Sequence, residues 1–516
     1  MIIQILFFIL SLALSLLFFL YGFNQYYLLN ASRHYAPPAL KEASGNLPSV
    51  SIHLPIYNEK YVVRRLVTAC TRMAEAYGIE KVSILILDDS DDDTVNEVDA
   101  LADEYARKDF QIEVVRRGSR QGFKAGALQV ALNKTPEEFI AIFDADFVPP
   151  ADFLLHSIPY FVQDERLGVV QSRWTHLNRD SNLLTKAISI LIDIHFVIEQ
   201  TGRYAAGCFQ NFNGSGGVLR KKAILEAGGW QADTLAEDLD LSYRMQMHGY
   251  RLLYLKDLQS PGEIPPTIPS FKVQQGRWTC GSLSSARKIL PALLSNRRIG
   301  IKQRLQAFIH LTGYMIHPLM VISFVITCIA TFLELNNPHI VQVNTLLPVA
   351  GNLVVVSATT ISTLRNLTWV FLSPFIALCM LAPWISSVST IRTQKLSLAH
   401  NLASLLVLFL LGFGLSLNDT RDACRALFTN RNWEFGRTPK YANLQNKQDW
   451  KLMRYQIPLD SLWIGELAFA ILGSLAIGSA VQQSNFTSLL ILVPFTAGYV
   501  FVFVLTILQS RGGKAS

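Results

Sequence analysis

The feature of this sequence that most constrains its fold is the uneven placement of its apolar residues. One apolar block, over residues 2–22, opens the chain and several more follow residue 303, while the stretch between them has a mixed composition. Half of the 516 residues are hydrophobic and only 16% are charged, which is low for a soluble protein. We therefore expect a soluble domain inserted between membrane-spanning segments, in a chain long enough for two or three domains.

The first apolar block contains no charged residue and is long enough to cross a bilayer as a helix. A cleaved signal peptide is the alternative, but such a peptide usually has a basic start, a shorter apolar stretch and a small-residue cleavage site, none of which is visible here. We expect an uncleaved anchor over residues 1–30. Because Arg33 and Lys41 follow it, the positive-inside rule places residues 30 onward in the cytoplasm.

The later apolar blocks predict further spans, grouped over residues 301–418 and 457–516. One of them contains Asn352 and several hydroxyl side chains, so a re-entrant segment is an alternative there. The expected spans lie near residues 309–333, 343–361, 368–390, 401–418, 463–482 and 487–508.

A polar loop rich in Lys and Arg separates the last two spans from the others, over residues 419–456. The positive-inside rule places this loop on the cytoplasmic side, together with the central domain. Arg392 and Lys395 would then face the outside, against the same rule.

The net charge of +7 does not indicate a nucleic-acid partner, because the basic residues crowd near the apolar blocks, where they mark the cytoplasmic side. The six cysteines are scattered, without a Cys-x-x-Cys pair or a histidine at zinc spacing. We expect reduced, mostly buried cysteines, and neither a disulfide framework nor a structural metal.

The central region, residues 45–300, alternates strand-like and helix-like patterns. This alternation predicts an α/β domain with a parallel sheet and helices on both faces. Ligands bind such sheets beyond the carboxyl ends of the strands. Two of the expected strands end on acidic clusters, Asp88-Asp89-Ser90 and Asp144-Ala145-Asp146, which places both at that edge. The expected strands cover residues 50–56, 81–87, 111–115 and 139–143.

Each acidic cluster also has a purely structural interpretation. Residues 88–93 fit a solvated turn that caps the next helix, and Asp144 and Asp146 fit a turn before Pro149. However, a buried strand that ends on two carboxylates one residue apart is a natural site for Mg²⁺ or Mn²⁺. These ions take carboxylate oxygens and keep positions open for phosphate oxygens.

The run Thr234-Leu-Ala-Glu237-Asp238 fits a capping box that opens a helix over residues 238–247. Asp238 would then lie in the first helical turn, where the helix dipole favours an ionised carboxylate. A carboxylate that is charged near neutral pH can accept the proton of an attacking hydroxyl group.

Residues 274–278, Gln-Gln-Gly-Arg-Trp, follow a proline-rich stretch. On a helix, Gln274, Arg277 and Trp278 share one face. A planar guanidinium suits a diphosphate, and an indole suits stacking on a pyranose ring. An interfacial anchor is the alternative, since Trp and Arg also occur at membrane boundaries.

Together these elements resemble the processive branch of glycosyltransferase family 2, which includes cellulose, chitin and hyaluronan synthases. That branch has an acidic pair, DxD, TED and QxxRW in this order, flanked by membrane helices. In this chain the threonine of TED is replaced by Ala236, so any role of that threonine is absent. The matching runs are DDS at 88–90, DAD at 144–146, AED at 236–238 and QQGRW at 274–278.

Finer features look closest to the cellulose-synthase-like A and C group of mannan, glucomannan and glucan synthases. They include residues 212–217, the run QQGRWTCGS and residues 435–441. In cellulose synthase a loop at a comparable place closes over the nucleotide, which makes Thr438 and Lys440 gating-loop candidates.

The resemblance implies a nucleotide-sugar-binding domain of the GT-A type, inserted between transmembrane helices. Asp88 or Asp89 would contact the nucleobase, and Lys124 would help to hold the donor. Asp144 and Asp146 would hold the donor diphosphate, Asp146 through Mg²⁺ or Mn²⁺.

On the acceptor side, the resemblance makes Asp238 the catalytic base. Gln274, Arg277 and Trp278 would line the acceptor site and support the leaving diphosphate. The implied reaction is the inverting transfer of a hexose from UDP-glucose or GDP-mannose to a growing β-linked glucan or mannan. The later spans would carry the polymer across the membrane.

Two other functions remain alternatives. A non-processive enzyme that glycosylates a membrane lipid would use the same donor chemistry. A transporter or receptor with a degenerate domain would have lost the acidic clusters, which are intact here. The architecture fits an integral membrane protein, expected in a bacterial inner membrane with the catalytic domain in the cytoplasm.

Overall fold

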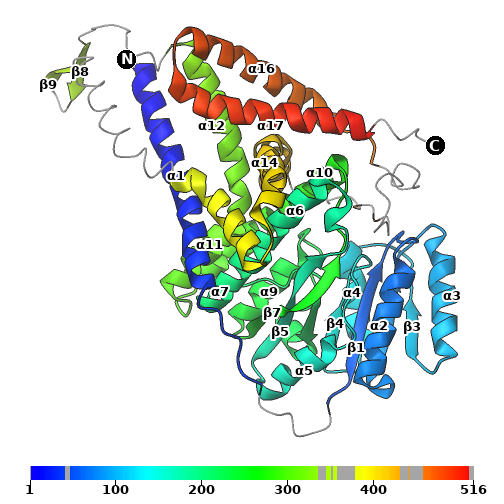
Figure 1. Ribbon diagram of the computed structural model, residues 1–516. Helices are drawn as coiled ribbons and strands as arrows, with labels where there is room; N and C mark the ends of the chain where they lie inside the picture. Colours follow the sequence, from blue (N-terminus) through cyan, green and yellow to red (C-terminus); the bar gives the residue numbers. More distant parts are fainter. Residues whose placement is uncertain are drawn as a thin grey trace.

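The structure is a computed structural model in which an α/β domain lies against a set of long helices (Figure 1). The sheet lies at one end of the molecule, and the last two helices, drawn in orange and red, lie at the other. The described residues are 2–40, 47–334, 345–349, 352–356, 378–429, 438, 440 and 457–510.

A seven-stranded sheet forms the centre of the α/β domain, with the strand order β3-β2-β1-β4-β6-β5-β7. Neighbouring strands pair in parallel except at β6, which is antiparallel to both β4 and β5. The parallel pairing expected for the strands near residues 50–56, 81–87, 111–115 and 139–143 is confirmed, and β6 is a further strand that runs in the opposite direction. The strands are β1 (Val50–Ile56), β2 (Val82–Asp88), β3 (Gln111–Val115), β4 (Phe139–Ile142), β5 (Leu167–His176), β6 (Gly217–Arg220) and β7 (Arg251–Gly262).

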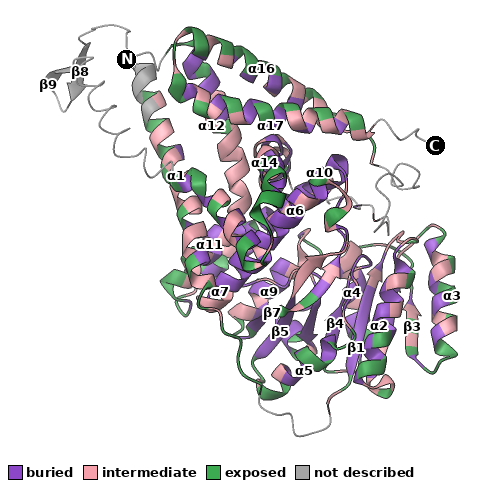
Figure 2. Cartoon of the chain, in the orientation of Figure 1, coloured by how far each residue is buried: buried purple, intermediate pink, exposed green. Residues whose placement is uncertain are grey.

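Strand β2 shows why the strand sequences are continuously apolar. Ile84 and Ile86 belong to the hydrophobic core on one face of the sheet, and Leu85 and Leu87 belong to the core on the other. Strands covered on both faces read as unbroken hydrophobic runs. Figure 2 shows central strands such as β1 and β4 in purple, the colour of buried residues. One core is covered by α2 (Val63–Tyr77), α3 (Thr94–Ala106) and α5 (Phe153–Gln163), the other by α4 (Phe123–Lys134), α8 (Lys221–Glu226) and α9 (Glu237–Met247).

Four helical segments among the described residues are long and apolar enough to cross a membrane. Their outer faces carry exposed apolar side chains such as Leu475 and Leu490, which would be costly in water and are suited to lipid. The segments are Ile9–Ser32 in α1 (Ile2–Ser32), Gly313–Phe332 in and before α12 (Ile316–Phe332), α16 (Leu462–Gln482) and α17 (Phe486–Ser510).

A fifth span is possible where α14 (Leu398–Gly414) and α15 (Ser416–Phe428) meet at an angle of 42°. The span expected over 401–418 is thus a broken pair of helices. The polar loop expected from residue 419 begins inside α15, because Arg421 and Arg425 lie on this helix, where both pair with Asp422.

Two further expected spans differ from the structure. Within 343–361 the described residues form a two-stranded antiparallel hairpin, β8 (Thr345–Val349) and β9 (Asn352–Val356), instead of a helix. Its valine-rich sequence favours a strand over a helix. Within 368–390 a helix covers residues 378–393, and residues 368–377 lie outside the described residues.

The longest helix outside the membrane candidates is α10 (Ile268–Ser295), which carries the Gln-Gln-Gly-Arg-Trp run. Thr267 caps it by accepting a hydrogen bond from the Ser270 backbone N–H, and Pro269 occupies its first turn, where a missing N–H costs little. The remaining helices are α6 (Leu183–Asp193), a π-helical turn (Ile194–Gln200), α7 (Thr201–Ala205) and α11 (Ile301–Leu311).

The expectation of reduced, mostly buried cysteines is confirmed. All six cysteines are free, and only Cys424 is exposed.

Strand β1 contains a fully buried histidine, which makes the stability of the α/β domain depend on pH. His53 Nε2 lies 2.8 Å from the Thr135 hydroxyl, and burial lowers the pKa of His53 from 6.5 to about 3. The folded protein therefore resists protonation that the unfolded chain accepts below pH 6.5. Stability that is present at neutral pH is lost as the pH falls.

We predict that lowering the pH from 7 to 5 costs the α/β domain about 2 kcal/mol through His53 alone. Thermal unfolding of the detergent-purified chain, followed across this pH range, should fall less steeply in His53→Gln than in the wild type. Equal slopes for the two proteins would contradict the assignment.

Candidate active site

The acidic clusters lie at the point where the strand order of the sheet reverses. From β1 the chain builds outward through β2 and β3, and then returns to place β4 on the other side of β1. Loops that leave β1 and β4 in opposite directions leave room for a ligand beyond the strand ends. Asp88 and Asp89 come at the end of β2, and Asp144 and Asp146 follow β4, so all four carboxylates lie at this edge.

Two neighbouring arginines hold the first acidic pair. Arg116 Nε donates to Asp88 over 2.9 Å, and Arg117 donates from two nitrogens to the two oxygens of Asp89. Arg117 also donates to the backbone carbonyl of Phe123 over 3.0 Å, which fixes the start of α4. The motif comparison did not identify these arginines, although their place directly after the third strand was a usable signal.

An aromatic ring and a guanidinium stack beside this pair. The Arg120 guanidinium lies 3.3 Å from the centre of the Tyr57 ring, in cation–π contact. The adjoining Asn58 has a positive φ of 55° and donates its backbone N–H to the Ser90 hydroxyl over 2.9 Å. The loops after β1 and β2 are therefore joined into one surface, which the sequence did not indicate.

Lys124 is bound at the centre of the site. Its ammonium lies 2.6 Å from Asp144 Oδ1 and 2.8 Å from the Gly214 carbonyl, and Glu237 is 3.7 Å away. The Ser215 hydroxyl accepts the Asp144 backbone N–H. Residues from α4, the segment before β6, and α9 thus converge on the carboxylate that follows β4.

Asp146 is nearly buried and pairs with a lysine from a distant part of the chain. Lys440 Nζ lies 2.5 Å from Asp146 Oδ2. The Asp146 backbone carbonyl accepts hydrogen bonds from the Glu263 N–H and from Arg65, which is also paired with the Glu263 carboxylate over 2.9 Å. Arg65 and Glu263 are site residues that the motifs did not reveal.

Asp144 and Asp146 supply carboxylate oxygens, the ligands that a hard divalent cation takes. In this structure each carboxylate is paired with a lysine ammonium. No group of three His, Cys, Asp or Glu side chains within the described residues is arranged to hold a metal alone. An ion bound here would therefore complete its coordination with phosphate oxygens and water.

Asp238 lies against Gly214, close to Lys124. A Cβ atom on Gly214, whose φ is 78°, would come within 2.8 Å of Asp238 Oδ2, so only glycine leaves space for this carboxylate. Burial, and next the negative charge of Glu237, raise the pKa of Asp238 to about 7. The helix dipole favours the ionised form of this carboxylate, as expected from its place in the first turn, but desolvation acts in the opposite direction and is larger.

The expected capping box is also absent. Helix α9 begins at Glu237 after Ala236, which supplies no side-chain cap. A Cβ atom on Gly281 of α10 would come within 2.7 Å of the Ala236 methyl group, so the start of α9 is held by packing on α10. Glu237 points toward Lys124 instead of back to Thr234, whose hydroxyl is buried and lacks a hydrogen-bond partner among the described residues.

Helix α10 brings its Gln-Gln-Gly-Arg-Trp run to the same region through aromatic contacts. Trp278 packs edge-on against Trp174 of β5 at 6.4 Å between ring centres, and Trp174 contacts Phe147, which follows Asp146, at 5.5 Å. Gln274 is 2% exposed, and its Oε1 has no hydrogen-bond partner within the described ranges. These contacts favour a site within the protein over a membrane anchor.

The structure therefore brings most of the predicted residues to one edge of the sheet. Lys124, Asp144 and Asp238 form its centre. Lys440 reaches Asp146, whereas the Thr438 hydroxyl is buried and has no hydrogen-bond partner in the described part of the chain. Arg277 lies on α10 in the same run as Trp278.

The mixed sheet with acidic clusters at its switch point defines a glycosyltransferase of the GT-A type. A model of "Glycosyl transferase family group 2" matches residues 139–417, more than half of the chain, and a model of "Glycosyl transferase family 2" matches residues 51–215. The chain belongs to glycosyltransferase family 2.

Curated relatives include plant enzymes. The probable glucomannan 4-beta-mannosyltransferase 4 of Oryza sativa subsp. japonica is 33% identical over 333 residues, which cover 64% of this chain and 59% of the relative. The glucomannan 4-beta-mannosyltransferase 2 of Arabidopsis thaliana is 37% identical over 260 residues, 50% of this chain and 48% of the relative. The chain thus spans about half the length of the curated relatives it matches.

Among solved structures, the mannosyltransferase PcManGT from Pyrobaculum calidifontis in complex with GDP-Man and Mn²⁺ has the same fold. The TM-score is 0.50 at 18% sequence identity, and the match covers 74% of this chain and 98% of that one.

Because the pKa of Asp238 is about 7, we predict that sugar transfer rises with pH between 6 and 8 as this carboxylate loses its proton. Glu237→Gln removes a negative charge that raises this pKa, so the midpoint of the profile should move to lower pH. Nucleotide release from the donor, measured across pH with detergent-purified protein, checks both. A midpoint that stays in place in Glu237→Gln would argue against Asp238 as the titrating group.

Asp146→Asn should raise the Mn²⁺ concentration for half-maximal activity by at least about tenfold, a loss typical even of outer-shell changes at metal sites. Asp152→Asn is a suitable control, because this acid follows the same strand but its side chain is 57% exposed. Nucleotide release, measured while Mn²⁺ is titrated, gives the Mn²⁺ concentration for half-maximal activity of each variant. Equal Mn²⁺ requirements in both variants would remove Asp146 from the metal site.

Proposed function

We propose that this chain transfers a hexose, mannose from GDP-mannose in the first instance, with inversion onto a β-linked mannan or glucomannan chain. The observation that carries the proposal is the placement of the half-buried Asp238 carboxylate beside the Lys124–Asp144 pair. It puts a base with a pKa of about 7 next to the groups expected to hold the donor diphosphate. The names of the relatives and of the solved mannosyltransferase support mannose and the guanosine nucleotide.

In the proposed reaction, Asp238 accepts the proton of the acceptor hydroxyl while that oxygen attacks the anomeric carbon. The new glycosidic bond forms as the bond from this carbon to the diphosphate oxygen breaks, and the nucleoside diphosphate leaves with the bonding electrons. Attack from the opposite face inverts the donor configuration. Lys124 orients the donor, with its ammonium held by Asp144 and the Gly214 carbonyl.

Asp144 and Asp146 would hold Mg²⁺ or Mn²⁺, which would offset the charge that develops on the leaving diphosphate. On this proposal Lys440 occupies the Asp146 carboxylate in the free enzyme and turns toward the diphosphate when the donor binds. Asp88 and Asp89, held by Arg116 and Arg117, would face the nucleobase.

The acceptor is expected to lie along α10, on the helix face that carries Gln274, Arg277 and Trp278. Two buried polar atoms in the described ranges, Gln274 Oε1 and the Trp174 indole nitrogen, have no hydrogen-bond partner, and sugar hydroxyl groups would satisfy them once the site opens. Processive growth and export through the membrane helices are part of the proposal. It is supported by the packing of α10 on α15 and by the backbone N–H of Ile268, which donates to Gln509 of α17 over 2.6 Å.

The apolar helices support a membrane protein. A cytoplasmic catalytic domain remains part of the proposal, and so do the bacterial inner membrane and the domain limits at 1–30, 45–300, 301–418, 419–456 and 457–516.

The deciding experiment supplies membranes that contain the protein with Mn²⁺ and radiolabelled GDP-mannose or UDP-glucose. Asp238→Asn is the inactive variant, and we expect it to lose about 10²- to 10⁴-fold in rate, the usual contribution of a general base. Polymer from GDP-mannose that β-mannanase digests, and that the variant does not make, is the expected result.

Other outcomes would replace parts of this proposal. Polymer from UDP-glucose alone would make the enzyme a glucan synthase. Label confined to the lipid extract would identify a lipid glycosyltransferase in place of a polysaccharide synthase. Undiminished polymer from Asp238→Asn would remove Asp238 as the base.

A further inference from the structure

Helix α10 presents two different faces to its surroundings. Gln274 and Trp278 are four residues apart and share the face toward the sheet edge. Lys272, Gly276 and Cys280 also repeat every four residues, on nearly the opposite face, because a two-residue offset turns a helix by about 200°. We refer to Lys272, Gly276 and Cys280 as the docking face of α10.

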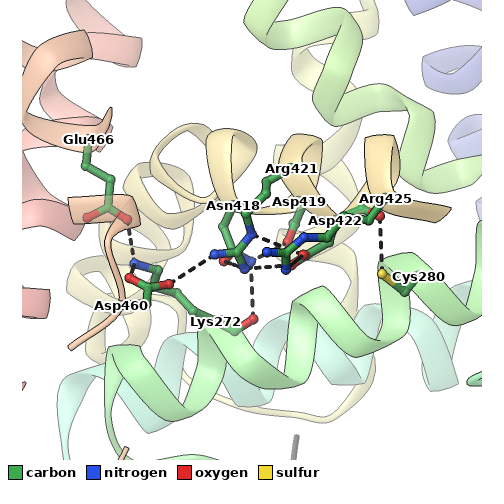
Figure 3. A network of polar contacts seen from close by, with 9 residues as sticks. All are labelled: Lys272, Cys280, Asn418, Asp419, Arg421, Asp422, Arg425, Asp460 and Glu466. Carbon is green, nitrogen blue, oxygen red and sulfur yellow. Dashed lines mark hydrogen bonds and ion pairs between the residues drawn. The ribbon is translucent and has the colours of Figure 1, made fainter. Parts of the chain in front are cut away.

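The docking face is bound by charged and polar residues from the membrane-associated helices (Figure 3). Lys272 Nζ lies 2.7 Å from Glu466 of α16, and both side chains are almost completely buried. The Asn418 side chain donates to the Lys272 carbonyl over 3.1 Å. The Cys280 thiol donates to the Asp422 carbonyl over 3.2 Å.

Gly276 is the point of closest approach between α10 and α15. A Cβ atom at this position would collide with Asp422 Oδ2, so a larger residue would displace the Asp422 carboxylate from α10. Asp422 is itself held by Arg421 over 2.8 Å and by Arg425 over 3.0 Å. The glycine of the Gln-Gln-Gly-Arg-Trp run is thus explained by helix packing and not by a contact with ligand.

The network continues to the segment that enters α16. Arg421 donates to Asp460 over 3.1 Å, and Asp460 also lies 3.5 Å from the Lys272 ammonium. A buried ion pair contributes little net stability, since desolvation offsets much of its attraction, but it is specific in geometry. Such a set of charges on one helix face is better suited to fixing the position of that helix than to strengthening the fold.

We propose that the docking face of α10, through Lys272–Glu466 and Gly276–Asp422, positions Gln274, Arg277 and Trp278 for the acceptor. Lys272 and Asp422 are positioning residues, which act through α10 and contact no reacting group. A rigid helix transfers any displacement of its docking face to the opposite face. The inference rests on the proposed acceptor role of that face.

The first test uses Glu466→Gln and Lys272→Met in detergent-purified full-length protein. The KM for a mannan oligosaccharide should rise by about 10- to 100-fold, the cost of misplacing a reacting group by about 1 Å. The affinity for GDP should stay within about twofold, because the donor residues lie on other elements. Lys272→Arg retains the positive charge, so its acceptor KM should rise less than that of Lys272→Met. Lys222→Met, which removes a lysine from an exposed ion pair, is the matched control.

A double-mutant cycle tests the contact at Gly276. Gly276→Ala alone should raise the acceptor KM, because its methyl group would collide with the Asp422 carboxylate. Asp422→Ala removes that obstacle, so the double variant should be less impaired than the sum of the two single effects. Additive effects would show that the two positions do not act together and would overturn the proposal.

A third measurement needs no glycan product, so it remains valid if the proposed function fails. In Glu466→Gln, hydrogen–deuterium exchange should become at least about fivefold faster in residues 268–280, while β1, β2 and β4 remain as protected as in the wild type. Unchanged exchange in α10 would overturn the proposal. So would a parallel loss of GDP affinity, acceptor KM and thermal stability, since that pattern would make the network a general structural element. Failure of the proposed function would instead show in the wild type, as the absence of glycan product.

Discussion

Charge compensation at the carboxyl edge of the sheet is the constraint on which the site depends. Buried carboxylates are costly unless each meets a cation or a set of donors. Here Arg117 meets Asp89, Lys124 meets Asp144, and Lys440 meets Asp146. These cations come from the end of β3, from α4 and from a segment close to three hundred residues further along the chain. The geometry of the site is therefore a product of the whole fold.

The neighbouring carboxylates of the site have different surroundings, and these surroundings suit them to different roles. Asp144 has a lysine within 2.6 Å, whereas desolvation and the neighbouring Glu237 raise the pKa of Asp238 to about 7. A group that gains and loses a proton near neutral pH suits acid–base chemistry, while a paired, charged group suits the binding of a cation or a diphosphate. The environment thus distinguishes a base from a ligand among acids of the same kind.

Much of this organisation could be predicted, and the errors have physical causes. The bounds of β1 and β3, the acidic ends of β2 and β4, and a helix near residue 238 follow from local apolar patterns. The antiparallel β6, the broken pair α14–α15 and the β8–β9 hairpin do not, since strand direction, helix breaks and the state of an apolar run depend on their neighbours. The capping box failed for the same reason: Ala236 packs on α10, and that contact sets the start of α9.

The class of protein can be inferred from the amino-acid sequence, because the order and spacing of acidic clusters at strand ends are local properties of the chain. The same motifs mark most of the residues that the structure gathers at the site. The partner that each of these residues contacts depends on the three-dimensional fold. Burial and a neighbouring acid raise the pKa of Asp238 against its helix dipole, and the close approach of Asp422 explains Gly276. Desolvation and packing are set by residues distant in sequence, and no local pattern encodes them.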